Sequence, residues 1–252
     1  QSYILKKEFK DFFKFGGFPE LILSDSLELK NKIINNYFDS VLYKDIIDRL
    51  RIKNIKLVEI TLKYLLNLFG NTFSISSYEN YLKSNKISYS LEDLYNIFKS
   101  LEDVFMISFL KEYSKSYKKT EFSKSKVYVF DSAYIHFLAR EAEDYGRILE
   151  NLVFIELFRR NNEIENKNIF YSNSSNRECD FVISNKGKVT NAIQVCYSIN
   201  EKNKEREVNG LIEAMNRFNL KEGLIITNEQ EETIKIKEKK IRVIPAWKWF
   251  LT

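Results

Sequence analysis

The first part of the chain repeats apolar residues every three or four positions, which is the spacing of amphipathic helices. Between Ser26 and Arg51 this pattern predicts a helix pair or one long helix. Leu57 to Phe69 gives the clearest such pattern, and Gly70 follows it, a residue common just beyond a helix end. Two more helices are predicted over Ser74 to Ser84 and from Ser90 to about Asp103, the second capped by Ser90.

Two apolar and aromatic runs then predict strands over Val104 to Tyr113 and Lys126 to Phe130. A loop rich in lysine, serine and tyrosine joins them. Three helices followed by a two-stranded hairpin are the elements of a winged helix, which we therefore predict for residues 53–135. Residues 1–52 form a predicted helical connector before it.

The last part of the chain mixes the periods of helices and strands. After a short helix from Ser132, it predicts helices over 146–161 and 205–218 and strands over 168–172, 178–184, 189–197, 223–227 and 241–244. A strand–helix–strand order requires a partly parallel sheet with a helix on its face. We therefore predict an α/β domain over residues 136–252 and a mixed α+β fold for the whole chain.

Composition narrows the class of protein. Of 252 residues, 44% are hydrophobic and 15% are aromatic, as in a packed globular protein. The net charge of +5 is compatible with nucleic-acid binding but does not require it. Two cysteines, no signal peptide and no long apolar run predict a reduced, cytoplasmic chain that does not enter a membrane. The sequence begins with Gln1 rather than Met, so we expect it to be part of a longer protein.

A set of polar residues in the C-terminal domain has the layout of a metal-dependent nuclease. Such sites place one acid on a helix, one on a strand, and an acid-x-Lys on the next strand, so that carboxylates hold a hard cation. Glu150 and Asp180 fill the first two places, but Gln194 and Cys196 stand where the acid and the lysine are expected. The amide of Gln194 carries no charge, and a thiol suits soft metals.

These departures predict a vestigial site with no catalytic residue and with Glu150 and Asp180 as weak metal candidates. A live nuclease would need a lysine from elsewhere, such as Lys167 or Lys204.

The loop between the two predicted strands of the winged helix is the candidate for nucleic-acid binding. Its lysines alternate with Tyr113, Tyr117 and Phe122, and lysines with aromatics can follow a phosphate backbone and stack on bases. The candidate residues are Lys115, Lys118, Lys119 and Lys124. A solvated, lysine-rich loop is the alternative interpretation. The third helix carries four acids and one lysine, which is the wrong charge for a reader of the major groove.

Five groups of residues, in this order, resemble the C-terminal region of prokaryotic AAA-type ATPases, a domain of unknown function found in bacteria and archaea. The resemblance covers nearly the whole chain and is carried by Phe15–Gly16–Gly17–Phe18–Pro19–Glu20, Lys126–Val127–Tyr128–Val129–Phe130–Asp131, the run from Leu149 to Leu157, Glu178–Cys179–Asp180–Phe181–Val182 and Ile244–Pro245–Ala246–Trp247.

The resemblance implies a P-loop ATPase core before the Gly-Gly-Phe-Pro-Glu turn, a winged helix after it, and a restriction-endonuclease-like PD-(D/E)xK domain at the end. Active nucleases of that fold carry a motif similar to Glu-Val-Lys, where this chain has Gln194–Val195–Cys196.

Three hypotheses follow. The first is a non-catalytic accessory region of a prokaryotic AAA-type ATPase, which positions the motor on DNA or on a protein partner. The alternatives are an active metal-dependent DNA nuclease with an altered site, and a protein-interaction or assembly module without nucleic-acid binding. The sequence contains no Gly-x-x-x-x-Gly-Lys-Ser/Thr motif, so ATP and Mg²⁺ are expected only for the missing core, and no cofactor for this part.

Overall fold

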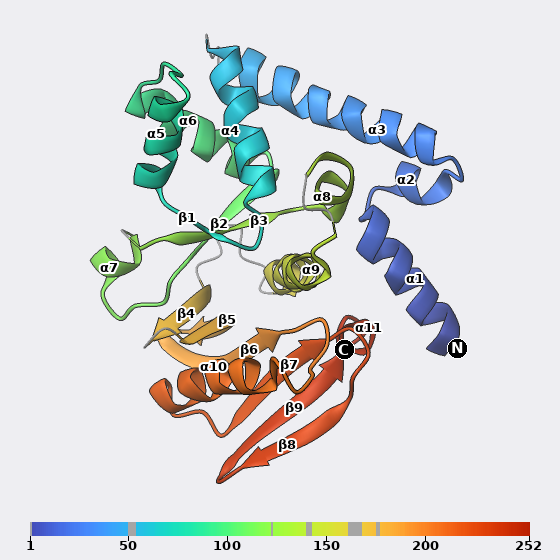
Figure 1. The fold of residues 1–252 in the computed structure, drawn as a ribbon, viewed down its shortest axis with the longest axis vertical. Coiled ribbons are helices and arrows are strands. Elements are labelled where there is room, and N and C mark those ends of the chain that lie inside the picture. The colour runs from blue at the N-terminus through green and yellow to red at the C-terminus, as the bar shows by residue number, and fades with distance from the viewer. Residues whose placement is uncertain (1, 50–53, 122, 140–142, 161–167, 175–176) are drawn as a thin grey trace. The chain divides into compact units, whose positions relative to one another are not determined.

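The computed structural model describes residues 2–49, 54–121, 123–139, 143–160, 168–174 and 177–252 (Figure 1). The chain divides into two compact units. We call residues 7–109 and 125–144 the helical unit. The sheet unit consists of residues 145–252 together with residues 1–6 and 110–124. Helices and strands are both abundant, so the predicted mixed α+β class is confirmed.

The helices predicted before residue 145 are present. They are α1 (Ser2–Phe15), α2 (Pro19–Leu23), α3 (Leu27–Ser40), the π-helix η1 (Val41–Asp48), α4 (Ile55–Asn67), α5 (Ile75–Ser84), α6 (Leu91–Asp103) and α8 (Ser132–Leu138). Ser90 caps α6 as predicted, because its hydroxyl accepts a hydrogen bond from the backbone N–H of Asp93 at 3.0 Å. The apolar run from Ser26 to Arg51 is divided between α3 and η1.

The helices of this region are accompanied by a three-stranded sheet in the order β1 (Thr72–Phe73), β3 (Ser125–Val129), β2 (Ile107–Lys111). Strands β2 and β3 were predicted, but β1 is too short to show a periodic pattern and was missed. The connection from β2 to β3 was predicted to be a loop and instead contains the short helix α7 (Tyr117–Glu121). Its residues have no apolar face, so no helical periodicity marks this segment in the sequence.

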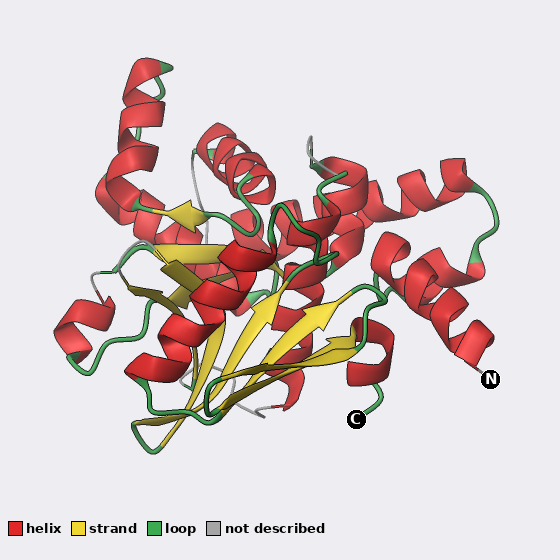
Figure 2. Cartoon of the chain, turned by 60° about the horizontal axis from the view of Figure 1, so that its bottom comes forward, coloured by secondary structure: helices red, strands yellow, loops and turns green. Residues whose placement is uncertain are grey.

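A six-stranded sheet forms the centre of the sheet unit. Its order is β4 (Ile169–Ser174), β5 (Arg177–Asn185), β6 (Lys188–Val195), β7 (Glu222–Thr227), β9 (Lys239–Pro245), β8 (Glu232–Ile236). The β6–β7 and β7–β9 pairs are parallel and the other pairs are antiparallel, as the strand–helix–strand order predicted. In Figure 2 its long yellow arrows fan out with the twist usual for β-sheets. The edge strand β8 and the last helix α11 (Ala246–Trp249) were not predicted.

Helices α9 (Tyr145–Arg160) and α10 (Lys204–Arg217) cover opposite faces of this sheet. Leu211 of α10 belongs to the same buried cluster as Ile225 and Val243, and Figure 1 shows α10 lying along the strands. Neighbouring side chains on a strand point to opposite faces. Leu224 therefore faces away from α10, and it lines a hollow together with Leu157 of α9.

Gly210 allows α10 to approach the sheet closely. A Cβ atom at this position would overlap the backbone carbonyl oxygen of Glu178 on β5. The glycine thus brings the buried face of α10 directly onto β5 and β6, where the candidate site lies.

The Gly-Gly turn between α1 and α2 is fastened to the start of α8. Gly16 has a φ of +73°, and the backbone N–H of Gly17 donates to Oδ2 of Asp131 at 2.9 Å. The other oxygen of Asp131 accepts from the N–H of Ala133 at 2.8 Å and caps α8. Burial raises the pKa of Asp131, and the two backbone donors oppose that rise. Two of the sequence groups that carry the resemblance therefore meet in one contact.

None of the helices in the described ranges combines the length and the apolar composition needed to cross a bilayer.

Candidate functional site

Asp180 and Gln194 lie opposite each other at the point where the ladder between β5 and β6 ends. The last backbone pair of the ladder is Phe181 with Ile193. Beyond it, side chains replace the ladder bonds. The N–H of Val195 donates to Oδ2 of Asp180 at 2.9 Å, and the N–H of Asp180 donates to Oε1 of Gln194 at 3.3 Å. Both side chains are buried, and together they join the two strands where the backbone does not.

Glu207 of α10 completes this group, and we call Asp180, Gln194 and Glu207 the seam cluster. Nε2 of Gln194 donates to Oε2 of Glu207 at 2.9 Å, and the guanidinium of Arg206 binds the other oxygen at 2.5 Å. Glu207 is 4% exposed. Sequence reasoning missed it, although one signal was available. Glu207, Leu211 and Ala214 share the i, i+4, i+7 spacing of the buried face of α10.

Cys196 lies beside the seam cluster as a protonated thiol. Burial, together with the nearby carboxylate of Glu207, raises the pKa of this cysteine to about 11. Its Sγ donates to the carbonyl oxygen of Ser198 at 3.1 Å. The raised pKa leaves little of the thiolate, which is the nucleophilic form of a cysteine. Cys179 is buried in the core of the sheet unit, where it packs as a small apolar residue.

Glu150 lies on α9, the helix that covers the face of the sheet opposite α10. It is 8% exposed on α9, whereas the amide of Gln194 points toward α10. Lys204 is an exposed residue at the start of α10, and Lys167 lies outside the described residues. In the part of the chain that the structure describes, no group of three or more His, Cys, Asp or Glu side chains is arranged to hold a metal ion. The structure thus joins Asp180 and Gln194 to Glu207, with Cys196 adjacent.

The candidate nucleic-acid residues lie in residues 110–124, which we call the basic segment and which belong to the sheet unit. Lys115, Lys118, Lys119 and Lys124 are all exposed. Their ammonium groups form no ion pair within the described ranges. Phe122, named with them from the sequence, lies outside the described residues.

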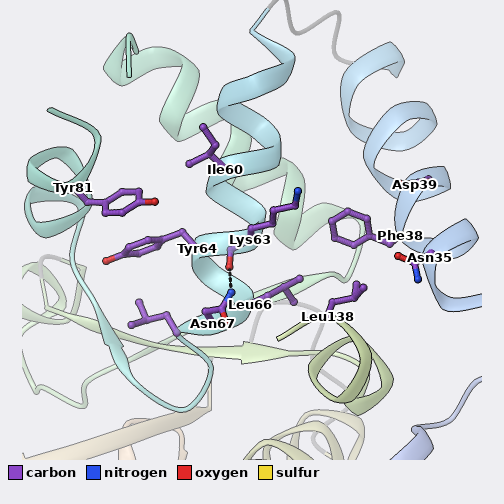
Figure 3. Close-up of a pocket in the computed structure, with 11 residues that line it drawn as sticks. Asn35, Phe38, Asp39, Ile60, Lys63, Tyr64, Leu66, Asn67, Tyr81 and Leu138 are labelled. Atoms are coloured by element: carbon purple, nitrogen blue, oxygen red, sulfur yellow. Dashed lines mark hydrogen bonds between the residues drawn. The ribbon is translucent and has the colours of Figure 1, made fainter. Parts of the chain in front are cut away.

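The helical unit contains a separate hollow of about 690 Å³ over the outer face of α4 (Figure 3). In this view Tyr64 and Tyr81 stand on one side, and Phe38 with Asn35 on the other. The two tyrosine rings are 4.8 Å apart between centroids. The volume of this hollow is within the usual range for ligand sites, about 300–1,000 Å³. It was not predicted from the sequence. The remaining lining residues are Asp39, Ile60, Lys63, Leu66, Asn67, Leu68 and Leu138.

Comparison with known proteins gives two family matches and two relatives. Residues 6–145 match the domain of unknown function DUF8612, and residues 145–249 match the domain of unknown function DUF4143. An uncharacterized protein of Methanocaldococcus jannaschii is 41% identical over 98% of this chain. One of Haemophilus influenzae is 26% identical over 100% of it. The chain spans 56% and 60% of the lengths of these relatives. No solved structure matches it.

Proposed function

Because the chain belongs to the DUF8612 family and continues into a DUF4143 match, we propose that it is a non-catalytic accessory region of a prokaryotic AAA-type ATPase. Its role is to position the motor on DNA. Three observations support this proposal: the five groups of residues that resemble such ATPases, relatives in an archaeon and a bacterium, and the greater length of both relatives.

The element order supports the two folds that the proposal needs. Helices α4, α5 and α6 followed by β2 and β3 agree with a winged helix. Helix α9, strands β4 to β6, helix α10 and strand β7 agree with a nuclease-like domain. Fold alone does not give activity, so the side chains at the site decide whether it is catalytic.

The hydrogen bonding of the seam cluster carries the proposal. Hydrolysis of a phosphodiester by this class of site needs carboxylate oxygens that face a hard cation. Here the Oδ2 atom of Asp180 accepts from the N–H of Val195, and the Oε2 atom of Glu207 accepts from Gln194. The amide nitrogen of Gln194 thus holds the carboxylate of Glu207. A metal-binding acid in place of Gln194 would instead repel that carboxylate. This arrangement stabilises the sheet and leaves the nuclease chemistry without its ligand charge and its lysine.

We expect no phosphodiesterase activity. Supercoiled plasmid incubated with the protein and either Mg²⁺ or Mn²⁺ should be nicked no faster than in buffer, as measured by gel electrophoresis. Asp180→Asn is the matched control, since it keeps an oxygen acceptor for the N–H of Val195 while removing the charge. Metal-dependent nicking that the parent shows and Asp180→Asn loses would establish a live site and reject the non-catalytic role.

A further inference from the structure

We propose that the basic segment binds single-stranded nucleic acid, with Tyr117 stacking on an unpaired base and the surrounding lysines contacting phosphates. This inference rests on the proposed DNA-positioning function and names the form of nucleic acid that the segment takes.

One end of the basic segment is fixed in the core of the sheet unit by Tyr113. The ring of Tyr113 meets Phe170 and Phe218 edge to face, at centroid distances of 5.5 and 5.0 Å. The hydroxyl of Tyr113 donates to the carbonyl oxygen of Gly187 at 3.1 Å, and the carbonyl oxygen of Tyr113 accepts from Nη2 of Arg217 at 3.3 Å. The position where the basic segment leaves the sheet is therefore well defined.

The other end is held as well, and the segment is cross-linked internally. The hydroxyl of Tyr171 on β4 donates to the carbonyl oxygen of Lys124 at 2.9 Å. Near the base of the segment, the N–H of Glu112 donates to Oγ of Ser123 at 3.2 Å, and that hydroxyl donates to the carbonyl oxygen of Thr120 at 2.8 Å. Fixing both ends reduces the entropy that the segment must lose when a ligand binds.

The lysines of the segment are available to phosphates. Lys115, Lys118, Lys119 and Lys124 are exposed and form no ion pair with a described residue. Contact with phosphates would therefore not require an existing ion pair to break. Neutralised phosphates release counterions, which makes binding strong at low salt and weak at high salt.

The exposed ring of Tyr117 favours binding of a single strand over binding of a duplex. Its side chain is 81% exposed on α7, between Lys115 and Lys118, so its ring is open to solvent within the cluster of cations. An aromatic ring can stack on a base only when the face of that base is uncovered. In a duplex the base faces are covered by their neighbours, so this ring contributes affinity only on an unpaired strand.

Fluorescence anisotropy with labelled oligothymidine and a random duplex of equal length tests the proposal. We expect the protein to prefer the single strand. Tyr117→Ala should weaken single-strand binding about tenfold and leave duplex binding unchanged, because one stacked base is lost. Tyr95→Ala is the control, since Tyr95 is also exposed, at 57%, but lies on the acidic helix α6.

A second variant separates the inference from the function on which it rests. Replacing Lys115, Lys118 and Lys119 with Glu should weaken binding of both probes. The log–log salt slope should fall by about 2 for the single strand and by about 3 for the duplex. If neither probe is bound by the parent, the DNA-positioning function itself fails. If both probes bind equally and Tyr117→Ala changes neither, the preference for a single strand is overturned while the DNA role stands.

Discussion

Gly16→Ala should destabilise the protein by about 2–5 kcal/mol, because two independent costs add at this position. The first is conformational. Gly16 has a φ of +73°, and the left-handed region costs an L-residue about 1–2 kcal/mol. The second is steric. The new Cβ atom would overlap Oδ1 of Asp131 and lie 2.9 Å from the backbone nitrogen of Ala133.

The carboxylate of Asp131 cannot move away without losing its bonds to Gly17 and to Ala133. The N–H of Gly17 is exposed and can bond to water, but the part-buried N–H of Ala133 would be left unsatisfied at a cost of about 1–3 kcal/mol. Denaturant unfolding followed by circular dichroism measures the loss.

Gly187→Ala is the matched control for this experiment. Its φ of +77° is nearly the same, but an added Cβ atom would meet nothing within 4 Å. It should therefore lose only the conformational part, about 1–2 kcal/mol. Equal losses in the two variants would show that the contact between the Gly-Gly turn and Asp131 adjusts without cost. A larger loss for Gly16→Ala would show that this contact holds the turn in place.

Gln194→Glu should cost about 3 kcal/mol at neutral pH, although it recreates the acid that active nucleases carry. In the parent, Nε2 of Gln194 donates to Glu207 at 2.9 Å. The substitution replaces that donor with a second buried carboxylate. Two like charges so close share a proton and raise the pKa of the pair in the folded state. The penalty is therefore present above that raised pKa and shrinks as the pH falls toward about 5.

The control is a double variant in which the acid and the amide exchange places, so that the pair again consists of one carboxylate and one amide. Gln194→Glu combined with Glu207→Gln should recover most of the stability and remove the pH dependence of the melting temperature. If Gln194→Glu alone melts like the parent at neutral pH, Gln194 and Glu207 do not face each other in solution. A rise of its melting temperature in Mn²⁺, absent in the parent, would show that this position binds a metal once its charge is restored.

Local sequence patterns predicted most of the fold. Repeats of 3.6 residues located α4 to α6 and α10, because these helices bury one face. Short apolar runs located β5 and β6, because these strands are buried on both faces of the sheet. Elements without a buried face were missed. Helix α7 buries no residue, and β8 is mostly exposed. For such segments tertiary contacts decide the structure, and they leave no periodic pattern in the sequence.

The candidate site could be predicted only in part. Asp180 and Gln194 were identified by motif spacing, and the structure does join them. Glu207 was missed because it lies outside the strand motif, on the helix α10 that follows β6. The packing of α10 on the sheet brings Glu207 next to Gln194. The hydrogen bonds that satisfy these side chains are set by three-dimensional geometry, and spacing along the chain does not report them. Whether the predicted residues act on nucleic acid stays a prediction.

The basic segment has a consequence for how such proteins can be rearranged by recombination. It lies within the DUF8612 match, yet its Tyr113 fills a socket formed by Phe170 and Phe218 in the DUF4143 match. A gene fusion that begins at residue 145 would contain Phe170 and Phe218 but lack Tyr113, so the rings of these two phenylalanines would be exposed to water. The region of the DUF4143 match is therefore not a complete structural unit. A fusion protein that is to keep this unit folded would need to include residues 110–124 as well.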